Sequence, residues 1–291
     1  MSGSPARAVL SNLRRGSTLS HFTRSFLTGL GLVSGICGLG TGLFPDIAKE
    51  FGAPVLVAAL TVALGYAAWA AWPRLSFSRD FALPATRISV VVGDLFAQDG
   101  HLVIGMSDTF DTELPVLIDH GSVQAQLLVR EFGGDTARLD AELTAALAGH
   151  PVVGTETREA KPLGKLDRYP LGTVAVLGTE QRRYYGVAYS RMRNDYVCDS
   201  SVSHLWNALM ELWPVVRNTA HLGTVSITAV GLGLARLSGR LSQADVVRLI
   251  IISYLTSSRD SVVAGHLRIV LAPGAAEQID LRRLSNYLDA Q

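Results

Sequence analysis

Three stretches of the chain place glycines or polar side chains where a predicted strand ends. In RISVVVGDLF, Gly93 and Asp94 follow an apolar run, and in HLVIGMSDTFDTE a similar run enters a loop dense in carboxyl and hydroxyl groups. In ITAVGLGLARLSG, a third run ends in two glycines, which can bring backbone N–H groups close to a phosphate. Ligands bind at the carboxyl ends of strands in α/β sheets, so these stretches are candidate parts of one site.

Each stretch also has an ordinary explanation when it is taken singly. Gly-Asp after a strand is usually a turn, in which the aspartate bonds to its own backbone. A loop rich in Asp and Thr is usually a solvated connection. The Gly-x-Gly of the third stretch lacks the third glycine of a dinucleotide fingerprint, because Arg236 stands in that place.

Composition narrows the class of protein. The 291 residues carry a net charge of +1, and 18% of them are charged, which gives no bulk attraction for nucleic acid. The positive mean hydropathy, +0.27, is unusual for a soluble enzyme. Cys37 and Cys198 are far apart, and the seven histidines show no metal-ligand spacing, so the sequence predicts neither a disulfide framework nor a metal site. No Ser/His/Asp nucleophile arrangement is visible either.

After residue 86, strand and helix patterns alternate. Helices interleaved with strands indicate a mixed sheet covered on both faces, in a three-layer α/β/α arrangement. Ser242 is expected to cap one helix, with Asp245 three residues later. Strands are expected at 87–92, 101–105, 172–178, 183–190, 223–230 and 266–272, and helices at 122–131, 136–148, 200–218, 243–256 and 275–288.

The order of the three stretches resembles that of the macro domain, an α/β/α module that binds ADP-ribose, over residues 87–291. The resemblance implies that Asp94 contacts the adenine amino group with help from the Leu95 amide, and that Gly231 to Ala235 hold the diphosphate. The loop after the second strand would meet the distal ribose. The ligand-binding set is therefore expected to be Asp94, Leu95, Ser107, Asp108, Thr109, Phe110, Asp111, Ser190, Gly231, Leu232, Gly233, Leu234, Ala235 and Arg236.

The chain departs from the hydrolytic macro domains in one respect. Those members carry an Asn-Ala-Ala-Asn stretch near the distal ribose, whereas here the loop reads GMSDTFDTE, and no asparagine occurs between Asn12 and Asn194. We therefore expect a binding module with no catalytic residue and no cofactor. Asp108, Asp111 and Glu113 are expected to face a cationic or hydrogen-bond-donating group on the distal ribose.

Two uncharged runs near the N-terminus, 25–45 and 53–73, are each about as long as a bilayer core requires. They predict a transmembrane hairpin after a basic cytoplasmic tail, 1–24, and before a linker, 74–86. Arginines outside both runs place the two termini in the cytoplasm, so the expected localisation is the bacterial inner membrane with two passes. Gly31, Gly35, Gly38 and Gly42 lie four residues apart in pairs and can serve close helix packing. The sequence leaves two roles open for these glycines. The first run packs against the alanine-rich second run of the same chain, or it is an oligomerising or rearranging helix.

A membrane hairpin fused to a macro domain resembles the membrane-anchored macro-domain effectors of type II Thoeris anti-phage systems. That resemblance implies an effector that binds an NAD-derived signal, such as histidine–ADP-ribose, made by a TIR-domain protein. It would then oligomerise or rearrange, disrupt the lipid bilayer and cause abortive infection, without binding nucleic acid. The alternative is a membrane-tethered hydrolase that removes ADP-ribose from modified proteins.

Overall fold

In a computed structural model, the structure describes residues 5–43, 45–72, 74–229 and 241–291. Two compact units are present. One contains Ser76–Ala275, and the other contains Ser4–Leu75 together with Ala276–Gln291. We call them the α/β unit and the helical unit.

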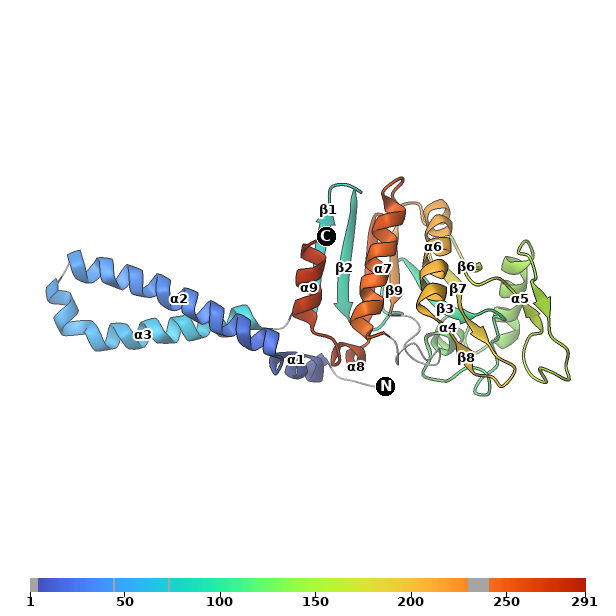
Figure 1. The fold of residues 1–291 in the computed structure, drawn as a ribbon, viewed down its shortest axis with the longest axis horizontal. Helices are drawn as coiled ribbons and strands as arrows, with labels where there is room; N and C mark the ends of the chain where they lie inside the picture. Colours follow the sequence, from blue (N-terminus) through green and yellow to red (C-terminus); the bar gives the residue numbers. More distant parts are fainter. Residues whose placement is uncertain (1–4, 44, 73, 230–240) are drawn as a thin grey trace. The chain divides into compact units, whose positions relative to one another are not determined.

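The α/β unit is built on a mixed sheet with the strand order β1-β2-β10-β9-β3-β7-β6 (Figure 1). Neighbouring strands from β2 to β7 run parallel, whereas β1, β6 and the short β8 pair in antiparallel fashion. β4 and β5 form a separate two-stranded sheet. The strands are β1 Ser76–Phe81, β2 Thr86–Val92, β3 His101–Ser107, β4 Gly154–Thr155, β5 Asp167–Arg168, β6 Val174–Gly178, β7 Arg183–Met192, β8 Cys198–Asp199, β9 Thr224–Thr228 and β10 His266–Leu271.

Helices cover both faces of this sheet, so the predicted three-layer α/β/α arrangement with a mixed sheet is confirmed. Strand residues alternate between faces. Leu102, Ile104 and Met106 of β3 pack with leucines of α4 (Val123–Glu131) and α5 (Thr136–Leu147). On the opposite face, the Tyr185 hydroxyl lies 2.9 Å from the Thr219 Oγ1 of α6. The helices on that side include α6 Val202–Thr219 and α7 Gln243–Ser258.

Serine and aspartate caps position the helices of the α/β unit. The Ser122 side chain accepts from the Ala125 N–H at the start of α4, and Asp135 accepts from Arg138 at the start of α5. At α7, Ser242 and Asp245 form the predicted capping box. Such caps satisfy N–H groups that have no partner inside the helix.

Among the described residues, the helical unit contains four helices, and the short α8 (Pro273–Ala276) lies at the boundary between the two units. The four are α1 Pro5–Leu13, α2 Gly16–Leu43, α3 Pro45–Ala71 and α9 Leu281–Asp289. The buried Asn12 side chain joins both ends of the chain. Its Nδ2 donates to the Ala276 carbonyl at 3.2 Å, and its Oδ1 accepts from the Leu281 N–H at 3.0 Å. The C-terminal helix, which the sequence grouped with the sheet, therefore packs with the N-terminal helices.

The predicted transmembrane hairpin is wrong. Within the ranges that the structure describes, no helix is both long and apolar enough to cross a bilayer. The uncharged runs are parts of longer helices, since α2 contains His21 and Arg24 and α3 opens with the sequence PDIAKEF. Glycine, serine and threonine also dilute the apolar content of α2 without adding charge. The spans at 25–45 and 53–73 are therefore corrected to helices of the helical unit, and the two-pass inner-membrane localisation, which depended on them, is corrected with them.

The glycines of α2 differ in what surrounds them. A Cβ at Gly29 would lie 3.4 to 3.6 Å from Tyr66 and Ala63 of α3, so this glycine lies at the contact between the two helices. No described atom comes within 4 Å of such a Cβ at Gly31, Gly35 or Gly38. Gly31 and Gly35 therefore lie away from the described atoms of α3, and Gly42 lies where side-chain surroundings are not described. The packing role of these glycines stays a prediction.

Candidate functional site

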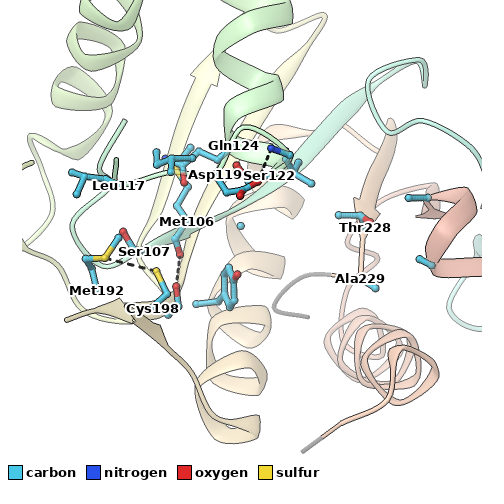
Figure 2. A pocket seen from close by; sticks show the side chains of 18 of the residues that line it. Met106, Ser107, Leu117, Asp119, Ser122, Gln124, Met192, Cys198, Thr228 and Ala229 are labelled. Carbon is cyan, nitrogen blue, oxygen red and sulfur yellow. Dashed lines mark hydrogen bonds between the residues drawn. The ribbon is translucent and has the colours of Figure 1, made fainter. Parts of the chain in front are cut away.

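A cavity of about 470 Å³ opens at the carboxyl ends of the parallel strands β3, β7 and β9 (Figure 2). Parallel neighbours end at the same edge of a sheet, so residues distant in sequence meet there. β3 contributes Gly105 to Ser107, β7 contributes Tyr189 and Ser190, and Thr228 and Ala229 come from the end of β9. Further lining residues come from the segment between Leu117 and Gln124 and from Gly274 and Ala275 of the short helix α8 (Pro273–Ala276), together with Met192, Cys198, Gln243 and Ala272.

The pairing of β3 with β7 is irregular at the cavity. Ser107 pairs with Ser190 after a shift in register that follows Met106. The Asp108 N–H donates to the Ser190 carbonyl at 2.8 Å, and the Ser190 hydroxyl donates to the Met106 carbonyl at 3.4 Å. The structure thus brings together two of the predicted ligand-binding residues, Ser107 and Ser190, on the cavity wall.

Asp108 follows Ser107 directly, but its carboxylate is buried and already bonded. It accepts from the Met192 N–H at 2.7 Å and from Arg168 Nη1 at 2.8 Å. Arg168 also binds Glu156 at 2.6 Å. The carboxylate of Asp108 therefore links the end of β3 to β5 and to the end of β7, and it is not among the cavity-lining residues.

Asp111 is still more enclosed. Its carboxylate forms an ion pair with Lys161 at 2.8 Å, and both side chains are fully buried. It also accepts from the Lys165 N–H at 2.6 Å and from the Thr109 hydroxyl. Phe110, which adopts a positive φ of 50°, is fully buried against Tyr169. A buried charge needs such partners, so Thr109, Phe110 and Asp111 anchor the loop in the interior.

Asp94 lies outside the described cavity lining. It follows β2, its Oδ1 accepts from the Phe96 N–H at 3.0 Å, and its Oδ2 is paired with Arg130 of α4. The Leu95 side chain belongs to the core beneath α4 and α5. The adenine contact that the resemblance implies for Asp94 stays a prediction. The predicted diphosphate loop, Gly231, Leu232, Gly233, Leu234, Ala235 and Arg236, lies outside the described residues.

The segment from Leu117 to Gln124, just before and at the start of α4, supplies a wall that the sequence did not indicate. Leu117 and Ile118 are buried, Asp119 is exposed, and Ser122 is the helix cap. These residues form no recognisable motif, and the sequence indicates only that a helix begins at Ser122. Other lining residues that sequence reasoning missed are Met106, Met192, Cys198, Thr228, Ala229 and Gly274.

A sulfur-containing group lies on another side of the cavity, where the Cys198 Sγ is 3.9 Å from the Met192 Sδ. Burial raises the pKa of the Cys198 thiol and, more strongly, the pKa of the Tyr189 hydroxyl. Both groups therefore stay protonated and uncharged at neutral pH. In the part of the chain that is described, no cluster of His, Cys, Asp and Glu side chains suits a metal ion. The geometry fits reversible binding of a small organic molecule.

The family model of the Thoeris protein ThsA macro domain matches residues 88–272, which include the whole sheet apart from β1 and the first two residues of β2. The chain belongs to the Thoeris ThsA macro-domain family. We therefore refer to residues 88–272 as the macro domain. Comparison with curated proteins gives no match.

The α/β unit is similar to solved macrodomain structures. A variant of the Oceanobacillus iheyensis macrodomain has a TM-score of 0.50 and 14% identity, and the match covers 75% of this chain and all of that one. A second variant of the same protein, with ADPR, has a TM-score of 0.45 and 11% identity, with coverage of 74% and 100%. At 14% identity, the likeness to the first of these structures shows the fold alone.

Proposed function

We propose that the macro domain binds an ADP-ribose derivative in the cavity at the ends of β3, β7 and β9, as the signal-binding domain of a Thoeris anti-phage effector. The observation that carries the proposal is this cavity, placed at the carboxyl edge of a parallel sheet in a chain of the ThsA macro family. Its volume of about 470 Å³ lies within the range of small-molecule sites. Variants of a macrodomain with the same fold include one with ADPR.

The chemistry of the wall supports a nucleotide sugar. Small residues at Gly105, Gly274 and Ala275 leave backbone groups accessible, and uncharged N–H donors suit a diphosphate. We propose that the glycine loop at 231–235, with Arg236, contributes further donors, and that Ser107 and Ser190 contact a ribose. The roles of Asp94 and the Leu95 amide at the adenine remain part of the proposal.

Titration calorimetry on the full chain tests this proposal. ADP-ribose should bind, whereas AMP should bind more weakly because it lacks the distal ribose and one phosphate. Ala229→Trp, which adds an indole to the cavity wall, should abolish binding. Ala145→Trp, at an exposed position on α5, is the matched control and should bind as the wild type does. Equal binding by the two variants would refute the cavity as the site.

We further propose that the domain binds its ligand without hydrolysing it. The carboxylates that the resemblance puts near the distal ribose, Asp108 and Asp111, are already paired with Arg168 and Lys161, and neither is among the described lining residues of the cavity. Asn194, the first asparagine after Asn12, bonds to Glu156 and Arg168 instead. Incubation with an ADP-ribosylated protein should release no ADP-ribose. Release that Ala229→Trp abolishes would favour the hydrolase alternative.

The signal is proposed to come from NAD through a TIR-domain protein, with histidine–ADP-ribose as one candidate. Adding that protein's reaction products to this chain should raise its melting temperature. A ligand at 100 times its dissociation constant stabilises the folded state by roughly 2.7 kcal/mol. Unreacted NAD is the control, and a rise of equal size with NAD alone would contradict the assignment.

We propose that ligand binding alters self-association through the helical unit. Large apolar side chains on α2 and α3 are exposed, and exposed apolar surface is a common feature of sites of association. Examples are Leu32, Ile36, Leu39, Val57 and Trp69, which are 64 to 72% exposed. Native mass spectrometry with and without ADP-ribose checks this, and an identical distribution of oligomers in both samples would contradict it. The bilayer disruption expected from the sequence relied on the transmembrane hairpin and is not retained.

A further inference from the structure

The short helix α8 contains the boundary between the two units of the chain. Gly274 and Ala275 line the cavity in the α/β unit, and Ala276, the residue that follows, begins the C-terminal part of the helical unit. A trans peptide bond keeps successive Cα atoms about 3.8 Å apart. A displacement of the cavity wall at Ala275 therefore reaches Ala276 through a single peptide bond.

The side-chain amide of Asn12 holds the far end of α8. This residue is 2% exposed, and its Nδ2 donates to the Ala8 carbonyl at 3.0 Å and to the Ala276 carbonyl at 3.2 Å. Its Oδ1 accepts from the N–H of Leu281, the first residue of α9, at 3.0 Å. A buried amide with both ends bonded resists displacement, because each bond that breaks leaves a polar group without a partner. One side chain of α1 thus joins the end of α8 to the start of α9.

Two further side chains attach the same C-terminal segment. The Arg15 Nη2 donates to the Glu277 carbonyl at 2.9 Å, and the Ser17 hydroxyl donates to the Asp280 Oδ2 at 2.6 Å. Asp280 is the N-cap of α9, where its Oδ1 accepts from the Arg283 N–H at 3.0 Å. Residues at the end of α1 and in the first turn of α2 therefore fix the position of the start of α9.

The helix α8 has little that holds it in place apart from its two ends. It is a single turn of four residues, and Ala276 alone among them is buried. The side chains of Gly274 and Ala275 are a hydrogen atom and a methyl group, and a helix this short has few hydrogen bonds of its own. The position of α8 is therefore sensitive to what lies in the cavity at one end and to Asn12 at the other.

We propose that α8 transmits ligand binding in the cavity to the helical unit, and that Asn12 is the positioning residue at its far end. The inference rests on the proposed ADP-ribose site and names the element that links this site to α1 and α9. A ligand packed against Gly274 and Ala275 restricts the motion of α8, and the bonds of Asn12 extend the restriction to the first turn of α9. A conformational change requires such a difference in binding between two states.

Hydrogen exchange of the full chain, measured by mass spectrometry with and without saturating ADP-ribose, tests the inference. In the wild type, ADP-ribose should slow exchange in the segment 277–288 about fivefold or more, which is the lower end of typical coupling between two sites. Asn12→Ala should remove this ligand-induced slowing. Calorimetry should still detect ADP-ribose binding to the variant, because Asn12 is not among the described lining residues.

Ser17→Ala and Ser20→Ala form a matched pair. Ser17 bonds to Asp280, whereas Ser20, three residues later on α2, donates to the Ser17 carbonyl of its own helix at 3.0 Å. Ser17→Ala should reduce the ligand-induced slowing at 277–288, and Ser20→Ala should preserve it. Equal slowing in the two variants would contradict the assignment of this segment as the link.

A purely structural role for Asn12 predicts a different result. Asn12→Ala would then speed exchange at 277–288 equally with and without ADP-ribose and leave the ratio of the two rates as in the wild type. Such an unchanged ratio overturns the inference, and so does a wild type in which bound ADP-ribose leaves exchange at 277–288 unaltered; the proposed function stands in both cases. If calorimetry shows that ADP-ribose does not bind the wild type, the proposed function fails and the inference fails with it.

Discussion

The loop from Ser107 to Thr112 and the segment from Leu117 to Gln124 both follow β3, yet their carboxylates lie in opposite surroundings. Asp111 is fully buried, and Lys161 and the Lys165 N–H occupy its oxygens. Asp119 is exposed on the cavity wall, where one oxygen accepts from Gly121 alone. Eight residues apart, one carboxylate stabilises the fold and the other is available to a ligand.

The difference shows that acidity alone does not identify a ligand contact. Burying an ion costs several kcal/mol unless its partners are well placed, so a carboxylate in the interior is committed to them. A carboxylate at the edge of a cavity stays hydrated until a ligand replaces the water. The availability of its oxygens, and not the residue type, separates the two roles.

The largest expected effect is on stability at the buried site. Asp111→Asn leaves the Lys161 ammonium buried without a counter-charge, which typically costs about 3 to 5 kcal/mol of the free energy of unfolding. Asp119→Asn should change that free energy by less than about 0.5 kcal/mol. Urea unfolding followed by circular dichroism measures both, and similar losses for the two variants would remove the distinction between these carboxylates.

Asp108→Asn should have an intermediate effect. Its Arg168 partner keeps Glu156 as a second acceptor, and an asparagine oxygen can still accept from the Met192 N–H. We expect a loss of about 1 to 3 kcal/mol in the same unfolding experiment. Since Met192 lines the cavity, ADP-ribose affinity should fall as well. A stable variant with unchanged affinity would show that this bond does not shape the wall.

The smallest expected effect concerns pH and His101, at the opposite end of β3. Burial lowers the pKa of His101 below its usual value, and its Nδ1 accepts from the Arg183 N–H at 3.1 Å. The folded state therefore favours the neutral ring. As pH falls below about 6.5, His101 gains a proton in the unfolded chain but not in the folded chain. The free energy of unfolding therefore decreases until the pH reaches the lower pKa that His101 has in the folded state.

Unfolding of His101→Gln at pH 7.5 and 5.5 checks this prediction. The variant should lose less stability between the two values than the wild type does, whereas His120→Gln, at an exposed site, should behave as the wild type. Equal pH dependence in all three proteins would contradict the assignment.

The sequence predicts the sheet well because its evidence is local. Each of the six expected strands is present, and the capping box at Ser242 forms as its spacing indicates. The sequence does not distinguish β1 from a linker, because SFSRDF alternates weakly and an edge strand buries little. The hairpin prediction is wrong because a stretch without charge is not necessarily apolar enough to cross a bilayer.

The site was harder to predict because its contacts are distant in sequence. Lys161 and Arg168 neutralise Asp111 and Asp108 from 50 and 60 positions away, and no local pattern pairs them. Ser107 and Ser190 were predicted, because both lie near strand ends. The wall at Asp119 and Gln124 depends on where the chain runs before α4, which only the tertiary structure shows.

A crystal structure of the full chain with ADP-ribose tests the central claim most directly. We predict ligand density in the cavity between Ser190, Ala229 and Gly274, with the Asp111–Lys161 ion pair unchanged. Density at another surface, or a ligand bonded to Asp108 or Asp111 after their ion pairs with Arg168 and Lys161 open, would contradict the account.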